Sequence, residues 1–123
     1  MFGDHQPNVA QWLEADNQMQ RHVTPFLIWA NYDIPEKEID MLSVNYLGSL
    51  MLQTIGMELP AYNQYLLELS ETLPVIIPQG CYDADGIFHN INDQKYATTI
   101  LQHKYVCYNF LLDKERNNQF YLP

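Results

Sequence analysis

The spacing of apolar positions along the chain predicts three to four helices. The first is a short helix within the polar stretch 9–22, carried by Val9, Trp12 and Leu13. The others span, in chain order, 44–55, 61–71 and 94–112. Ser43 precedes the second span as a candidate N-cap, and Gly56 follows it at the position where glycine commonly ends a helix. Pro60 opens the third span, and Asp93 is placed to cap the last one.

The last helical span carries one broad apolar face. Its members are Ala97, Ile100, Leu101, Tyr105, Tyr108 and Leu112. This spacing is typical of a helix surface that packs against a core or an interface, so we interpret these side chains as core and interface residues.

Shorter apolar runs predict the strands. Residues 26–30 form an unbroken apolar run after Pro25, which is typical of a strand buried on both faces, as in a parallel α/β sheet. A second strand is predicted over 75–77, closed by Pro78, and the turn 83–86 predicts a small β-hairpin. Together with the helices, these runs indicate an α/β class with two or three short strands and three to four helices.

Composition and charge narrow the classes of function. The chain has 123 residues, of which 47% are hydrophobic and 17% charged, so 1–123 has the size and apolar content of a single domain. The formal net charge of −9 argues against binding to nucleic acid and against a basic patch for anionic lipid. No apolar run is long enough to span a bilayer, and Met1–Gln6 lacks the regions of a signal peptide. We therefore expect the chain alone to be soluble, with no targeting signal of its own.

One group of residues suggests chemistry. Met1-Phe2-Gly3 resembles the end of a core strand and is followed at once by Asp4 and His5, so we expect the chain to have lost an upstream part. A carboxylate and an imidazole at the end of a central strand suit Zn²⁺ or Mn²⁺. Such a site needs a further ligand and, for group transfer, a nucleophile. The alternative is a turn aspartate that hydrogen-bonds the backbone next to a surface histidine.

The remaining reactive side chains have simpler interpretations. His22 is interpreted as a partly exposed residue at the start of the strand, and neither His89 nor His103 has a metal-ligand spacing to another histidine. Cys81 and Cys107 are interpreted as ordinary thiols. The turn 83–86 lacks the later ligands of a calcium loop, so we expect a plain turn there.

Several segments together resemble the lipoteichoic acid synthase and phosphoglycerol transferase family, which is sulfatase-like and belongs to the alkaline phosphatase superfamily. The segments are, in chain order, 2–8 (FGDHQPN), 24–34 (TPFLIWANYDI), 43–50 (SVNYLGSL), 56–60 (GMELP), 73–76 (LPVI) and the final helix around 105–113. The resemblance covers nearly the whole chain and follows the order of the family. It implies that this chain is the C-terminal piece of an alkaline-phosphatase-like α/β/α sandwich, and therefore a partial domain.

The resemblance also implies an activity. Members of the family have a membrane-anchored, extracytoplasmic catalytic domain in which a threonine attacks a phosphatidylglycerol-type lipid. A divalent metal, often Mn²⁺, is held there by a glutamate, the threonine and an Asp-His pair. Only the pair maps onto this chain, as metal ligands Asp4 and His5. The glutamate, the nucleophile and the residues that hold glycerol phosphate lie upstream in the family, and the segment between Asn8 and Thr24 is shorter here than in most relatives.

These observations predict a fragment of a metal-dependent transferase or sulfatase-like hydrolase. The parent enzyme is expected to act on phosphoglycerol, phosphoethanolamine or sulfate-like groups of cell-envelope lipids or polymers, and the chain alone is expected to be inactive. Two alternatives stay open. The chain is a non-catalytic remnant or interaction module that forms homo-oligomers or binds a protein partner, or the parent is a true sulfatase, with Cys or Ser as the source of formylglycine.

Overall fold

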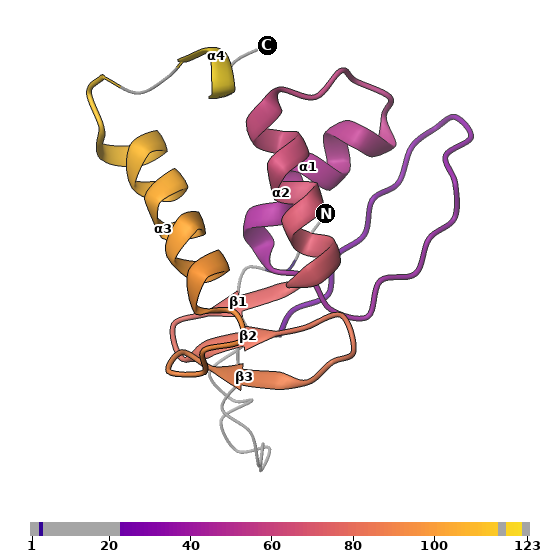
Figure 1. The fold of residues 1–123 in the computed structure, drawn as a ribbon. Helices are drawn as coiled ribbons and strands as arrows, with labels where there is room; N and C mark the ends of the chain where they lie inside the picture. Colours follow the sequence, from indigo (N-terminus) through magenta and orange to yellow (C-terminus); the bar gives the residue numbers. More distant parts are fainter. Residues whose placement is uncertain (1–2, 4–22, 116–117, 122–123) are drawn as a thin grey trace. The chain divides into compact units, whose positions relative to one another are not determined.

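The computed structural model describes residue 3 and residues 23–115 and 118–121 (Figure 1). The chain divides into two compact units, Met1–Ile34 and Pro35–Pro123, and each unit is described by itself. The helix predicted within 9–22 lies outside the described residues.

The apolar run of the first unit is extended, but it is not buried on both faces. Residues 23–30 contain no regular strand, and Phe26 forms a single bridge position. Leu27 and Trp29 are 61% and 77% exposed, whereas Phe26 and Ile28 are half-buried. The prediction of a strand buried on both faces is therefore wrong for this run. An apolar run indicates affinity for a core, but whether both faces are covered depends on elements that the run itself does not contain.

The second unit contains every helix and strand of the described residues. The elements in chain order are α1 (Val44–Thr54), α2 (Ala61–Thr72), β1 (Val75–Ile77), β2 (Gly80–Tyr82), β3 (Phe88–Asn90), α3 (Ala97–Leu112) and α4 (Asn118–Tyr121). Figure 1 shows α1 and α2 beyond the β1 edge of the sheet, with β3 on the far side. The predicted α/β class, with its short strands and its number of helices, is confirmed. Among the described helices, none combines the length and the apolar character needed to cross a bilayer.

Helix α1 begins and ends within one residue of the predicted bounds. Gly56 has a positive φ of 74°, which glycine adopts without a steric penalty. The Gly56 N–H donates to the Gln53 carbonyl at 3.0 Å, and the Met57 N–H donates to the Leu52 carbonyl at 3.1 Å. These two bonds form a Schellman motif, which satisfies carbonyls that the helix end would otherwise leave unpaired.

Ser43 stands at the N-cap position of α1, but its hydroxyl makes no capping hydrogen bond. Its Oγ instead accepts from the Ile76 N–H at 2.9 Å and donates to the Ile76 carbonyl at 3.2 Å. The Ser43 N–H also donates to the Pro74 carbonyl at 2.8 Å. Since β2 pairs with the other edge of β1, Ser43 satisfies backbone groups on the outer edge of β1.

The three strands form an antiparallel sheet in the order β1–β2–β3. Cys81 of β2 lies opposite Ile76 of β1 on one side and opposite His89 of β3 on the other. The β2–β3 connection is the predicted turn 83–86, in which Asp83 Oδ1 accepts the N–H of Asp85 at 3.1 Å and that of Ile87 at 2.9 Å. A carboxylate that holds nearby N–H groups in this way is a common means of fixing a turn.

The core of the second unit draws on α1, α2, β2 and α3. Its buried members are Tyr46, Leu66, Leu69, Leu73, Cys81 and Ile100. Tyr46 is fully buried, and its hydroxyl donates to the Leu73 carbonyl at 3.1 Å. Burial is the main cause that raises the pKa of Tyr46, so its phenol remains a hydrogen-bond donor at neutral pH.

Helix α3 begins later than predicted, and Asp93 does not cap it. The first helical residue is Ala97, and Tyr96 occupies the N-cap position. Asp93 Oδ1 accepts the Lys95 N–H at 3.0 Å in the turn before the helix. The other carboxylate oxygen of Asp93 faces His89. The prediction failed because aspartate stabilises tight turns as readily as it caps helices.

The broad apolar face predicted for α3 is mostly exposed. Ile100 is buried, but Leu101, Tyr105, Tyr108 and Leu112 are between 51% and 67% exposed. The helix packs through another side, where the Phe110 ring stacks on Tyr62 of α2 with centroids 5.1 Å apart. Since α3 is apolar around most of its circumference, periodicity alone does not determine which side is buried.

We expect Ser43→Ala to lower the free energy of unfolding by about 1–3 kcal/mol, because it leaves the Ile76 N–H and carbonyl without the Ser43 hydroxyl. Urea unfolding followed by circular dichroism measures the loss. Ser70→Ala is the matched control, because within the described residues the Ser70 hydroxyl donates to the Leu67 carbonyl one turn back and to no group of another element. If both variants lose the same free energy of unfolding, the hydrogen bonds between Ser43 and β1 contribute no more than an ordinary hydroxyl bond within a helix.

Candidate functional site

The predicted metal ligands Asp4 and His5 lie outside the described residues, as does His22. Gly3, the residue before the Asp-His pair, is described. The Gly3 N–H donates to the Pro25 carbonyl at 2.9 Å, and the Thr24 hydroxyl donates to the Gly3 carbonyl at 2.9 Å. A Cβ at position 3 would lie only 3.0 Å from Thr24 Cβ, so glycine permits this close approach. The backbone just before Asp4 is therefore held against the start of the apolar run.

A second polar group, which we call the His89 cluster, lies where the hairpin meets the turn before α3. It consists of Asp83, His89, Asp93, Lys95 and Tyr96. Because side chains alternate along a strand, Asp83 follows Cys81 on the same face, and Cys81 lies opposite His89. The hairpin register therefore brings the Asp83 carboxylate to the imidazole.

The His89 ring is held at both nitrogens. Nε2 lies 2.8 Å from Asp83 Oδ2, and Nδ1 lies 3.0 Å from Asp93 Oδ2. Lys95 Nζ is 3.2 Å from the same Asp83 oxygen and 4.8 Å from the centre of the Tyr96 ring. Two carboxylates can both accept from one imidazole only when both ring nitrogens carry protons, so the geometry fits the imidazolium form.

The electrostatics of the cluster agree with its geometry. The hydrogen bond to Asp83, followed by the one to Asp93, raises the pKa of His89 above its usual value. The bond from His89 is also the main cause that lowers the pKa of Asp83, while the Lys95 backbone N–H is the main cause that lowers the pKa of Asp93. Asp83 and His89 are both largely buried, so each charge is paired where water is scarce.

This arrangement determines what the cluster can do. An imidazolium with both nitrogens engaged has no lone pair for a proton or a metal, so His89 joins the hairpin to the turn before α3. The described residues contain no group of three or more His, Cys, Asp or Glu side chains positioned to hold a metal ion. Every buried side-chain nitrogen and oxygen among them has a hydrogen-bond partner. The cluster is a structural network of paired charges.

A second histidine lies between α2 and α3. His103 Nδ1 is 3.2 Å from the Tyr65 hydroxyl, and His103 Nε2 is 3.5 Å from Cys107 Sγ. Burial lowers the pKa of His103, raises that of Cys107, and is the main cause that raises the pKa of Tyr65 to about 12. All three groups are therefore neutral at physiological pH, and a protonated thiol is a poor nucleophile. The structure supports the interpretation of Cys107 as an ordinary thiol, and both cysteines are free.

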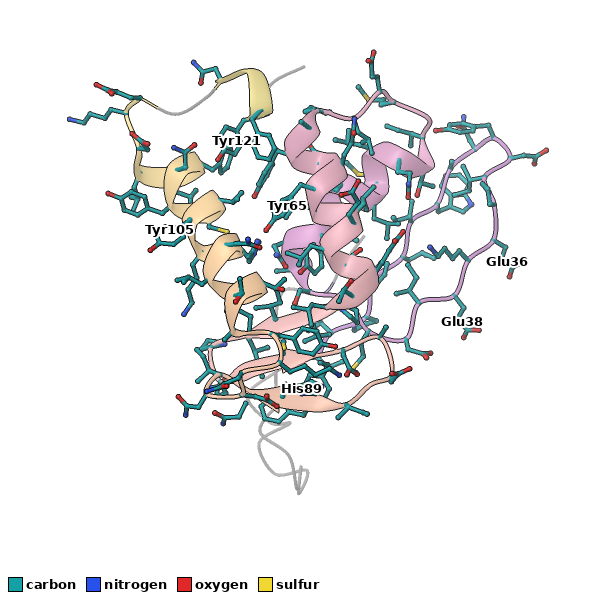
Figure 2. The ribbon with its side chains drawn as sticks, viewed as in Figure 1. Glu36, Glu38, Tyr65, His89, Tyr105 and Tyr121 are labelled. Atoms are coloured by element: carbon teal, nitrogen blue, oxygen red, sulfur yellow. The ribbon has the colours of Figure 1, made fainter. Side chains whose placement is uncertain are left out.

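The second unit also has an open groove of about 300 Å³ beside α1 and α2. Its lining comes from the loop before α1, from α1 and from the region of α2: Lys37, Glu38, Ile39, Leu42, Tyr46, Leu50, Gln53, Leu67, Ser70, Glu71 and Pro74. Figure 2 shows Glu38 and its neighbour Glu36 on that loop. The charged lining side chains are of both signs, which favours neither an anion nor a cation.

Sequence reasoning missed the His89 cluster, although a signal for it was present. The hairpin was predicted, and its alternation places Asp83 and His89 on one face. Asp93 also follows His89 by four residues. From the sequence, Asp83 is interpreted only as a turn residue and Asp93 only as a helix cap, so both carboxylates are expected to bond backbone N–H groups. In the structure, one oxygen of each carboxylate also faces the His89 imidazole.

The two buried histidines give opposite dependences of stability on pH. The folded state raises the pKa of His89, so we expect the free energy of unfolding to fall as pH rises above about 6.5 through that raised pKa. The folded state lowers the pKa of His103, so stability should also fall as pH drops below about 6.5. Urea unfolding across pH 5–8 should therefore give a maximum near the usual histidine pKa.

Matched variants separate the two contributions. His89→Gln should remove the decline in the free energy of unfolding at pH values above the maximum. His103→Gln should remove the share of the decline below the maximum that is due to His103. NMR titration of the imidazole carbons should give a midpoint above 6.5 for His89 and below 6.5 for His103. A His89 midpoint at or below the usual value would contradict the imidazolium assignment.

Comparisons with family models, with curated proteins and with solved structures found no match for this chain. The family resemblance therefore depends on the quoted motifs alone, and function has to be argued from the chemistry and geometry of the residues themselves.

Proposed function

We propose that this chain is the C-terminal part of a divalent-metal-dependent enzyme of the phosphoglycerol transferase kind. The intact parent transfers or hydrolyses a phosphoglycerol, phosphoethanolamine or sulfate-like group on a cell-envelope lipid or polymer, from an extracytoplasmic domain anchored to the membrane. The observation that carries the proposal is the pairing of Gly3 with Thr24 and Pro25, directly before Asp4 and His5. This pairing fixes the backbone of Gly3, the residue that precedes the Asp-His pair in the sequence.

The donor set of Asp4 and His5 fits a divalent cation such as Mn²⁺ or Zn²⁺. A hard carboxylate oxygen and a neutral imidazole nitrogen are both usual ligands of these ions, and we propose Mn²⁺ for the parent. When bound, such an ion lowers the pKa of an oxygen nucleophile and offsets negative charge on phosphoryl oxygens. Two ligands are fewer than a protein site for these metals normally has, so this chain contributes part of the site.

The exposure of the apolar run supports a larger parent domain. Leu27 and Trp29 lie directly after the Gly3 contact and remain mostly exposed. An unbroken apolar run of this kind normally lies in a sheet that is covered on both faces. We propose that upstream polypeptide of the parent covers these side chains. The nucleophile, Thr in a transferase or formylglycine in a sulfatase, also belongs to that part.

A non-catalytic role is the second candidate, and one observation favours it. Helix α3 exposes several large apolar side chains that the rest of the second unit leaves uncovered. Exposed apolar surface of this kind is typical of interaction sites. An interaction module and a former enzyme are compatible in one chain, because the apolar face of α3 and the Asp-His pair belong to different segments.

The pure chain should bind Mn²⁺ weakly and show no Mn²⁺-dependent phosphodiesterase activity on a phosphoglycerol ester, because it has two ligands and no nucleophile of its own. Paramagnetic broadening of amide NMR signals reports the binding. The Gly3 and Phe26 amides should broaden together, since Gly3 is bonded to Pro25. Asp4→Ala and His5→Ala should each raise, at least about tenfold, the Mn²⁺ concentration that is needed for the same broadening.

Asp40→Ala is the matched control, because Asp40 is an exposed aspartate in the loop before α1. It removes the same charge and should leave the broadening at Gly3 unchanged. Broadening at Gly3 that persists in Asp4→Ala would refute the metal assignment. Mn²⁺-dependent turnover by the pure wild-type chain would refute the prediction that the chain alone is inactive.

A further inference from the structure

Four of the five large apolar residues that α3 exposes form a continuous stripe, and the fifth, Leu111, is 71% exposed beside it. We define the α3 stripe as Leu101, Tyr105, Tyr108 and Leu112, which are 51%, 66%, 59% and 67% exposed. Figure 2 shows Tyr105 on the side of α3 that faces away from α2, whereas Tyr65 points between the two helices. Large apolar side chains grouped in this way on a surface mark an interaction site.

Helical geometry places the four side chains on one narrow face. At 3.6 residues per turn, their spacing of four, three and four residues confines them to about 60° of the circumference. The buried Ile100 and His103 lie on a different side of the helix, which packs toward α2. The alternating spacing is the same as that of the apolar seam in a pair of packed helices.

The stripe is symmetric about its midpoint. Read in either direction, it runs Leu, Tyr, Tyr, Leu, with steps of four, three and four positions. An interface between two identical chains related by a two-fold axis brings the same patch of both copies together, and a patch that is symmetric about its midpoint pairs like residues with like. When two copies of α3 pack antiparallel, Leu101 faces Leu112 of the second copy and Tyr105 faces Tyr108 of the second copy.

We propose that the α3 stripe is the site at which a second copy of this chain binds, through antiparallel packing of the two α3 helices. The proposal is independent of the proposed enzyme ancestry, because it uses no residue of the Asp-His region. Its occupant is a second copy because the surface complements itself.

The charge pattern agrees with this occupant. Lys104 is the one Lys, Arg, Asp or Glu residue within α3, and in the antiparallel pair it lies beside Asn109 of the second copy. No like charges therefore meet across the stripe. The net charge of −9 is carried elsewhere and repels a second copy at long range, which salt screens. Association through the stripe should consequently strengthen with ionic strength.

The size of the stripe sets the expected affinity. Two tyrosines and two leucines, each exposed by half or more, bury roughly 400–500 Å² per copy, which is below the ~800 Å² typical of stable complexes. We therefore expect a dissociation constant on the order of 100 μM. The dimer should be populated at high protein concentration and absent in dilute solution.

Sedimentation equilibrium from about 10 μM to about 1 mM, at about 0.05 M and about 0.5 M NaCl, tests the proposal. Wild type should show a monomer–dimer equilibrium that is tighter at the higher salt. Tyr105→Lys and Tyr108→Glu should each weaken dimerisation at least about tenfold, because a charge enters the apolar seam. Tyr32→Lys is the matched control, since Tyr32 is a similarly exposed tyrosine outside α3. Circular dichroism checks that every variant is folded.

Mixing variants tests the antiparallel orientation. Position 105 of one copy faces position 108 of the other, so a mixture of Tyr105→Lys with Tyr108→Glu should recover at least about tenfold of the lost affinity. A mixture of Tyr105→Lys with Tyr105→Glu should not recover, because those positions do not meet. Recovery in the second mixture instead of the first would overturn the antiparallel packing. A wild-type chain that stays monomeric at about 1 mM, or a Tyr105→Lys variant that dimerises like wild type, would overturn the proposal.

Discussion

The second unit depends on the way β1 is held at both edges. Its inner edge pairs with β2, and its outer edge would present unpaired backbone groups to solvent. Ser43 closes that edge with its backbone N–H and its hydroxyl, while Tyr46 bonds the carbonyl of Leu73 one turn further along α1. A three-residue strand is too short to be stable in isolation, so these contacts tie the start of α1 and the end of α2 to the sheet.

Different interactions join the α3 region to the sheet and to α2. On the sheet side, paired charges of the His89 cluster connect the hairpin to the turn before α3, with both imidazole nitrogens engaged. On the helix side, aromatic rings such as Tyr62 and Phe110 fill the space between α2 and α3. Rings of this size hold the helices apart and still bury apolar area. Because these contacts use one side of α3, its other apolar side is left at the surface.

The two proposals rest on different parts of the molecule. The enzyme proposal rests on a backbone contact at Gly3, on the donor chemistry of Asp4 and His5, and on the exposed apolar run that follows. The proposal of self-association rests on the symmetry of the α3 stripe. Both proposals use large apolar side chains that lie at the surface of the described residues.

Local chemistry in the sequence determined the α/β class, the bounds of α1 and α2, the strand β1 and the hairpin turn. These features depend on neighbours in the chain, such as the positive φ of Gly56 or the N–H groups within reach of Asp83. Only the tertiary structure decided that Ser43 bonds β1, that Asp93 faces His89, and which side of α3 is buried. A hydroxyl or carboxylate has several possible partners of equal chemistry, and a helix that is apolar around most of its circumference has several possible buried faces. The choice among them depends on which distant elements come within contact distance, and short-range spacing carries no information about that.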